Sequence, residues 1–145
     1  MDSTVPLVDI GLVIQLAVAP VFLLSGIGIV LTVLTNRLAR VVDRARRLEE
    51  AARAASGEAL EERRRELVVM ADRARLMNRA ITLSTCSALL VAVVVVLLFL
   101  AALLEFNATV PIAGLFILAM LALIGALVLF LREVFLAIRA LKIGV

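Results

Sequence analysis

Three long apolar runs, separated by polar segments, dominate the chain. They cover residues 10–34, 80–104 and 111–131, and none of them contains Asp, Glu, Lys or Arg. About 20 apolar residues in a helix are enough to cross the hydrocarbon core of a bilayer, which is about 30 Å thick. The valine-rich second run also suits a β-strand, but its length and the need to satisfy backbone groups in lipid favour a helix. The pattern therefore predicts an all-α integral membrane protein with three transmembrane helices.

The segments between the runs complete the predicted organisation. Residues 1–9 form a short external N-terminus, and the brief external loop 105–110 requires the second and third helices to be antiparallel neighbours. Residues 132–145 are expected to form a cytoplasmic extension that prolongs the third helix, with a helix that lies along the membrane surface as the alternative. On this extension, apolar side chains on one side are expected to face the polar segment of residues 35–79: Val134, Ile138 and Leu141.

Residues 35–79 are predicted to form an antiparallel helical hairpin, called the hairpin below. Apolar or small residues recur there at alternating spacings of four and three, the period of a coiled-coil seam. Ser56 and Gly57 interrupt this pattern and predict the turn between the two arms, with Gly57 available for a left-handed conformation. The predicted interface between the arms consists of Leu38, Val41, Leu48, Leu60, Leu67 and Met70.

Composition excludes several kinds of chemistry. The chain has 145 residues, of which 64% are hydrophobic and 19% charged, and its mean hydropathy of +1.16 excludes an ordinary soluble protein. It has no His, no Trp, no Tyr and one Cys, which excludes a His-ligated metal, a Ser-His-Asp triad and an intrachain disulfide. No catalytic, cofactor-binding or metal-binding residue is predicted, and we expect a protein that is not an enzyme and needs no cofactor.

The distribution of basic residues predicts the orientation. Twelve of the 15 Lys and Arg residues lie between Arg37 and Arg79, and the other three follow residue 131. Residues 1–9 and 105–110 contain none. Since basic residues in short loops remain in the cytoplasm, the N-terminus is expected outside, with the hairpin and the C-terminus inside.

Several arginines cluster where the first two apolar runs meet the hairpin. The guanidinium group of arginine matches the geometry of a phosphate, and these arginines are expected at the depth of anionic lipid headgroups. Nucleic acid is disfavoured as a partner, because eight acidic residues leave the hairpin with a net charge of only +4 and it has no aromatic residues for base stacking. The predicted headgroup-binding residues are Arg37, Arg40, Arg44, Arg75 and Arg79.

Small and polar residues within the apolar runs indicate close helix packing. On the first helix they share one face with Gln15, whose amide can form a hydrogen bond across a subunit contact or line a narrow aqueous path. On the other two helices they recur every four residues, as at many close helix contacts. The residues predicted for helix packing or a pore are Gly11, Gln15, Ala19, Gly26, Ser84, Ala88, Ala92, Ala122 and Ala126.

These features favour a structural or accessory membrane subunit. It is expected to pack through its transmembrane helices and hairpin, either with copies of itself or within a larger membrane complex. A homo-oligomeric ion channel is the alternative. A channel requires a polar stripe through the full depth of a span, and Gln15, Ala19 and Gly26 supply a partial one.

Residues 20–50, with the sequence PVFLLSGIGIVLTVLTNRLARVVDRARRLEE, carry a family resemblance. The segment is similar to an uncharacterised bacterial family of small three-span membrane proteins known as domain of unknown function 2721, and the resemblance extends across most of the chain. Its most specific part is the stretch from Thr35 to Arg40, followed by Asp43-Arg44-Ala45-Arg46. The resemblance implies the three-span fold and a location in the bacterial inner membrane, and it implies no activity.

Overall fold

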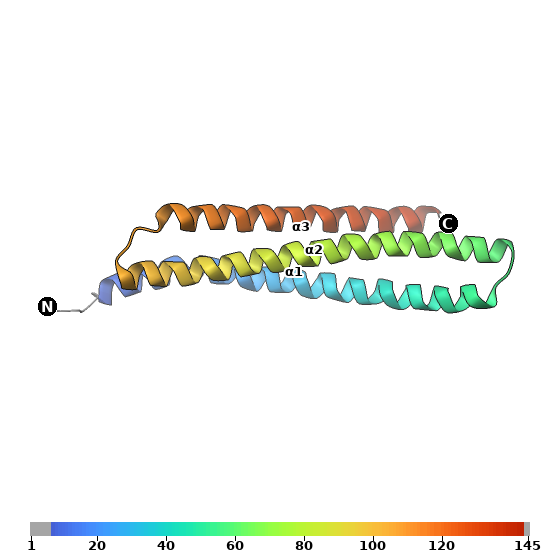
Figure 1. Ribbon diagram of the computed structural model, residues 1–145, viewed down its shortest axis with the longest axis horizontal. Helices are drawn as coiled ribbons and strands as arrows, with labels where there is room; N and C mark the ends of the chain where they lie inside the picture. The colour runs from blue at the N-terminus through green and yellow to red at the C-terminus, as the bar shows by residue number, and fades with distance from the viewer. Residues whose placement is uncertain (1–6, 144–145) are drawn as a thin grey trace. The chain divides into compact units, whose positions relative to one another are not determined.

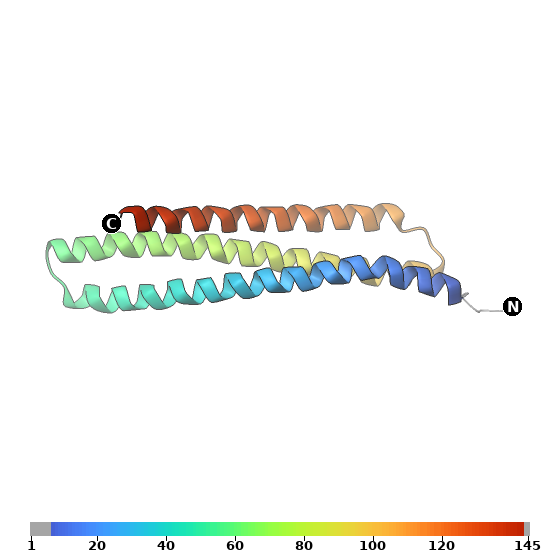
Figure 2. The same ribbon diagram turned by 180° about the vertical axis from the view of Figure 1, so that it is seen from behind.

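Three long α-helices make up the structure, a computed structural model that describes residues 7–143 and, among these, the side chains of residues 10–139 and 141. The helices are α1 (Leu7–Ala54), α2 (Glu58–Leu104) and α3 (Thr109–Ile143) (Figure 1; Figure 2 gives the reverse view). Each contains a stretch of at least 18 residues that is apolar enough to cross a membrane. The prediction of an all-α protein with three such helices is confirmed.

The helix boundaries follow local sequence signals. Helix α1 ends at Ala54, and Gly57 has a φ of +71°, a left-handed conformation that glycine adopts without steric cost. At the start of α3, the Asn107 Oδ1 accepts hydrogen bonds from the backbone N–H of Thr109 at 3.1 Å and from its hydroxyl at 2.8 Å. Asn107 thereby caps the N-terminal end of α3.

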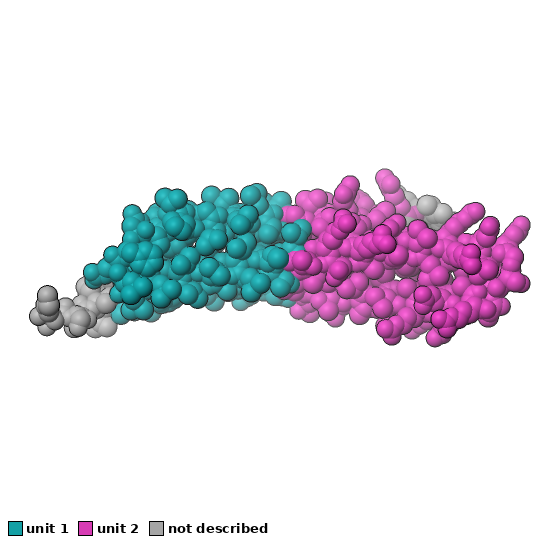
Figure 3. All heavy atoms as spheres, in the orientation of Figure 1, with its two compact units in different colours: residues 1–30, 83–124 teal, residues 31–82, 125–145 magenta. Residues whose placement is uncertain are grey.

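Two compact units divide the chain, and each contains parts of all three helices (Figure 3). Unit 1 combines Met1–Val30 with Leu83–Ile124, and unit 2 combines Leu31–Thr82 with Gly125–Val145. Unit 1 therefore contains most of the apolar runs, and unit 2 contains the hairpin and the C-terminal part of α3. Of the expected external N-terminus, residues 1–6 lie outside the described residues, as do residues 144–145 of the C-terminal extension.

In unit 2, the hairpin arms pack through the residues that the seam pattern selects. A cluster of four buried side chains, Val41, Leu48, Met70 and Met77, forms its centre. Leu38 and Leu67, with alanines from both arms, pack against this cluster, and Leu60 nearer the turn is half-buried. Burial of apolar side chains from both arms is the main stabilising contribution to the hairpin.

Helix α3 continues through unit 2, but the side that it buries against the other helices of this unit differs from the expected one. Ile138 and Leu141 are exposed, whereas Glu133 has no exposed surface. The expectation that the apolar side of residues 132–145 would face the hairpin is therefore wrong for these two residues. The side of α3 that faces the other helices is determined by a charged contact, which the next subsection describes.

Candidate functional site: a buried carboxylate between two arginines

The candidate site lies in unit 2, around the carboxylate of Glu133 on α3. Glu133 follows the apolar run 111–131 by two residues, and α3 passes through this point without interruption. The helix backbone thus holds the carboxylate rigidly, and its side chain is completely buried. A buried carboxylate needs charged or hydrogen-bonding partners, because burial removes the water that otherwise stabilises it.

Two arginines from the other two helices supply these partners. Arg73 of α2 donates to the Glu133 Oε1 through Nη2 at 2.8 Å and through Nε at 3.1 Å. Arg37 of α1 places its Nη2 2.8 Å from the Glu133 Oε2. The exposed side-chain fractions are 13% for Arg73 and 34% for Arg37. One carboxylate therefore links all three helices of unit 2.

The two halves of this contact differ in geometry. Arg73 forms aligned hydrogen bonds, whereas the Oε2 that faces Arg37 accepts no aligned hydrogen bond despite the short separation. The attraction between Arg37 and Glu133 is thus mainly electrostatic. The guanidinium of Arg37 also lies over the ring of Phe130, with its central carbon 5.4 Å from the ring centroid. This cation–π contact gives Arg37 a second attachment to α3.

The arrangement is suited to holding helices together. One guanidinium group lies against each carboxylate oxygen of Glu133, so the carboxylate is engaged by groups of α1 and α2. No group of three or more His, Cys, Asp or Glu side chains that could hold a metal ion occurs among the residues that the structure describes.

The structure divides the five predicted headgroup arginines among three environments. Arg37 is engaged by Glu133, and the side chains of Arg40 and Arg44 line a cavity of about 250 Å³ together with Arg37 and Arg73. Arg75 and Arg79 line a separate groove between α2 and α3. The five arginines therefore do not form one surface, and Arg37 has a protein partner that the sequence pattern did not reveal.

The residues predicted for helix packing or a pore fall into two groups. On α2 and α3, Ser84 and Ala126 are buried, Ala88 and Ala122 are half-buried, and Ala92 is exposed. Within unit 1 the hydroxyl of Ser87 donates a hydrogen bond of 2.8 Å to the backbone oxygen of Ala119, which joins α2 to α3. The second group, on α1, is exposed throughout: Gly11, Gln15, Ala19 and Gly26.

Sequence reasoning did not identify Glu133 or Arg73 as partners. One signal was available, because Glu133 is the sole acidic residue after Glu105 and lies close to the end of an apolar run. Several arginines also lie close to the corresponding ends of the other two runs. An isolated acid opposite an excess of arginine is a candidate for an ion pair between helices.

The fold and this site define a small all-helical membrane protein with three helices long and apolar enough to cross the bilayer. The chain belongs to a family described as protein of unknown function (DUF2721), whose family model matches residues 17–143. This match confirms the resemblance and its extent over most of the chain. Searches of curated proteins and of solved structures found no match.

Proposed function

We propose that this protein is a non-enzymatic membrane subunit that assembles through an exposed face of α1, either with copies of itself or within a larger membrane complex. The single observation that carries this proposal is the position of Gln15. Its side chain is exposed within the apolar run 10–34, five residues after the start of the run, and it forms no hydrogen bond with a residue that the structure describes. In a bilayer, an amide without a partner costs several kcal/mol.

The glycines on the same face support an interface with another chain. A Cβ atom built at Gly11 or Gly26 meets nothing within 4 Å, so packing within this chain does not require glycine at these positions. A glycine within a helix costs roughly 0.5–1 kcal/mol relative to alanine. Close approach of a second helix explains both the glycines and the unpartnered amide, because small residues allow two backbones to meet and a polar group on the partner can bond to Gln15.

Replacing Gly26 by leucine is expected to disrupt assembly without disturbing the fold of the monomer. The added side chain enters open space in the single chain but overlaps a helix packed against this face. Overpacking of this kind costs about 1–3 kcal/mol, which corresponds to roughly a 5- to 150-fold loss of association. Native mass spectrometry of gently extracted membranes measures the fraction of protein in the assembly.

Gly28→Leu is the matched control, because it adds the same side chain on the same helix at nearly the same depth. A Cβ at Gly28 also meets nothing within 4 Å, but position 28 lies about 160° around the helix from position 26. We expect Gly28→Leu to retain the wild-type assembly. Equal assembly of the Gly26→Leu variant and the wild type would exclude this face as the interface.

A homo-oligomeric channel is the second candidate, and it uses the same Gln15 face to line an aqueous path. The two candidates differ in what Gln15→Leu changes. A channel shows an altered conductance in bilayers when Gln15 loses its amide, whereas an accessory subunit passes no ions alone and is recovered with larger partners. Purified protein that turned over a lipid or nucleotide by itself would contradict the non-enzymatic part of the proposal.

The proposed orientation places the N-terminus outside, and the hairpin and C-terminus in the cytoplasm of a bacterial inner membrane. The concentration of basic residues in the hairpin supports it. In a Cys86→Ser background, Ser56→Cys at the hairpin turn is expected to react with a membrane-impermeant thiol reagent only after lysis. Val110→Cys near the start of α3 is expected to react in intact cells whose outer membrane has been permeabilised, and the reverse pattern would contradict this orientation.

A further inference from the structure

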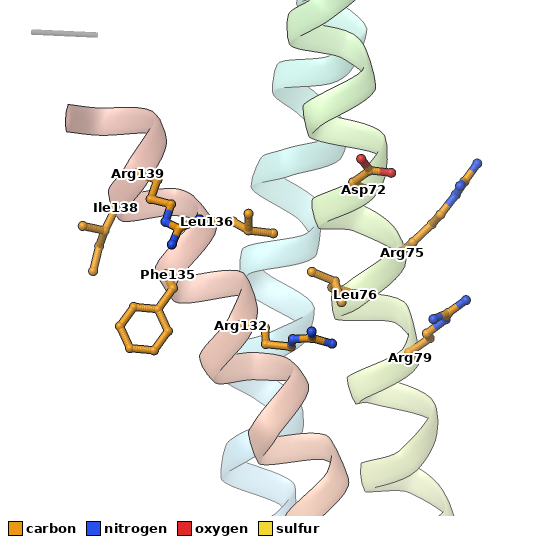
Figure 4. Close-up of a pocket in the computed structure, with 9 residues that line it drawn as sticks. All are labelled: Asp72, Arg75, Leu76, Arg79, Arg132, Phe135, Leu136, Ile138 and Arg139. Atoms are coloured by element: carbon orange, nitrogen blue, oxygen red, sulfur yellow. The ribbon is translucent and has the colours of Figure 1, made fainter. Parts of the chain in front are cut away.

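A large groove lies between α2 and α3 within unit 2, and the site around Glu133 does not account for it. Its volume is about 1030 Å³. Arg75 and Arg79 of α2 and Arg132 and Arg139 of α3 contribute four positive charges to its lining, against one negative charge from Asp72 (Figure 4). The groove therefore has an excess of three positive charges, which favours an anionic ligand.

These four arginines have no counterion among the residues that the structure describes. All four are exposed, and none forms an ion pair or hydrogen bond with a side chain that the structure describes. They differ in this respect from Arg37 and Arg73, both of which form an ion pair with Glu133. Figure 4 shows Arg132 extending into the space between the helices, while Arg75 and Arg79 extend from the outer side of α2. Long exposed arginine side chains can turn toward a ligand at small cost.

The positions of these arginines along the chain match the depth of lipid headgroups. Arg79 directly precedes the apolar run 80–104, and Arg132 directly follows the run 111–131. By helix geometry, Arg75 and Arg139 lie about 6 and 10 Å further from those runs. The groove thus begins where an apolar surface ends and continues into a polar region, as the boundary of a bilayer does.

Part of the groove lining is apolar. Leu76 and Leu136 point into the space between α2 and α3, and Phe135 lies further out on α3 (Figure 4). Leucine side chains contribute nothing to the binding of a small hydrated anion. They match a ligand that carries a hydrocarbon chain beside its negative charge.

We propose that this groove binds one anionic phospholipid. Its phosphate contacts Arg75 and Arg139, and the beginning of one acyl chain lies along Leu76 and Leu136 as it passes toward the apolar runs. Asp72, farther from the apolar runs, accepts hydrogen bonds from headgroup hydroxyls, which favours phosphatidylglycerol over a lipid whose headgroup adds another negative charge. The proposal is independent of assembly through α1, because the groove is formed by α2 and α3 alone.

The test measures how much phosphatidylglycerol the full-length protein retains. We compare wild type with the triple variant Arg75→Gln, Arg79→Gln, Arg139→Gln in nanodiscs of mixed phosphatidylcholine and phosphatidylglycerol, and count bound lipid by native mass spectrometry after release. Each arginine near an anionic surface contributes about a fivefold factor, so the triple variant is expected to lose at least about tenfold in retained phosphatidylglycerol. Circular dichroism verifies that the variant remains helical.

The matched control removes the same charge elsewhere in unit 2. Arg53→Gln, Arg64→Gln and Arg65→Gln change exposed arginines on the arms nearer the hairpin turn. This control variant is expected to retain wild-type levels of phosphatidylglycerol. An equal loss in both triple variants would overturn the proposal, because it would show a general effect of net charge and no defined lipid site.

A second measurement distinguishes a phospholipid from other anions. A photoreactive phosphatidylglycerol is expected to crosslink within residues 72–79 and 132–139, and Leu136→Gln, which places a polar group at the acyl chain, is expected to reduce that crosslinking several-fold. Crosslinks confined to residues 37–47 would overturn the assignment. So would competition by inorganic phosphate or a poly-glutamate peptide that matched competition by short-chain phosphatidylglycerol.

Discussion

Replacing Glu133 by alanine is expected to lower the free energy of unfolding of unit 2 by about 3 kcal/mol. The substitution leaves Arg73, which is 87% buried, and the partly buried Arg37 without a counterion. It also removes two hydrogen bonds from Arg73. Removal of one member of a buried ion pair costs about 3–5 kcal/mol, and the partial exposure of Arg37 places this case at the lower end of that range. Hydrogen exchange of the full-length protein in nanodiscs measures the loss.

Two further variants separate the charge from the space that Glu133 fills. Glu133→Gln preserves the shape but removes the charge, and we expect it to retain only part of the stability. Arg73→Met combined with Glu133→Leu removes the Arg73–Glu133 contact from both sides, and it is expected to recover much of the loss because apolar side chains of similar volume often replace buried ion pairs at little cost. Stability unchanged in Glu133→Ala would show that water already compensates these charges.

If Arg73→Met combined with Glu133→Leu recovers most of the stability, as we expect, then the main contribution of the ion pairs is not stability. Apolar contacts between long helices tolerate a shift of one turn, because the apolar pattern repeats along the helix. The carboxylate of Glu133 can contact Arg37 and Arg73 in only one position of α3 along the axes of α1 and α2. We therefore expect the ion pairs to fix the register of α3 against α1 and α2, while apolar burial supplies most of the stability.

The helices and the contact between the hairpin arms were predictable from the sequence because each depends on a repeated pattern. The three charge-free runs have the length that a membrane requires, and the seam repeats over several turns of each arm. The turn was predictable from a single residue, Gly57, since its left-handed conformation is one that other residues adopt at a cost. Repeated apolar spacing and the backbone preference of a glycine depend on neighbouring residues, so both can be recognised in the sequence.

Glu133 was not predictable in the same way because its burial depends on two residues that are distant in the sequence. The apolar pattern of α3 favours a buried face that includes Ile138 and Leu141, yet both are exposed and Glu133 is buried. Arg37 and Arg73 lie 96 and 60 positions away from it. The electrostatic attraction between Glu133 and two guanidinium groups outweighs the preference for burying the apolar side of α3. The sequence alone does not show which of its arginines contact Glu133.

The same difficulty applies to the arginines at the ends of the apolar runs. By position alone, Arg37 and Arg79 are equivalent, because both lie within a few residues of a charge-free run. In the structure, Arg37 contacts Glu133 and Phe130, whereas Arg79 lines the groove between α2 and α3. Which arginines remain available to lipid thus depends on where the carboxylate of Glu133 is buried.

Replacing Met77 by alanine is the second change with a large expected effect, and it tests the apolar contribution to unit 2. Met77 is completely buried in the cluster formed with Val41, Leu48 and Met70. Truncating a buried methionine removes its apolar contacts and leaves a cavity, at a cost of about 2–5 kcal/mol. We expect a loss of about 3 kcal/mol, because the alanines that flank the cluster, Ala45 and Ala74, are too small to fill the space.

The matched control for Met77→Ala is Val69→Ala, which truncates a side chain on the same helix that is 44% exposed. Its expected cost is below about 1 kcal/mol, since little buried surface is lost. Hydrogen exchange of amides in residues 38–48 and 67–77 localises both effects to the hairpin. The cost of Met77→Ala is expected to be the same in low and high salt because no charge is involved. A loss no larger than that of Val69→Ala would mean that the apolar seam contributes little and that the ion pairs of Glu133 hold the three helices of unit 2 together.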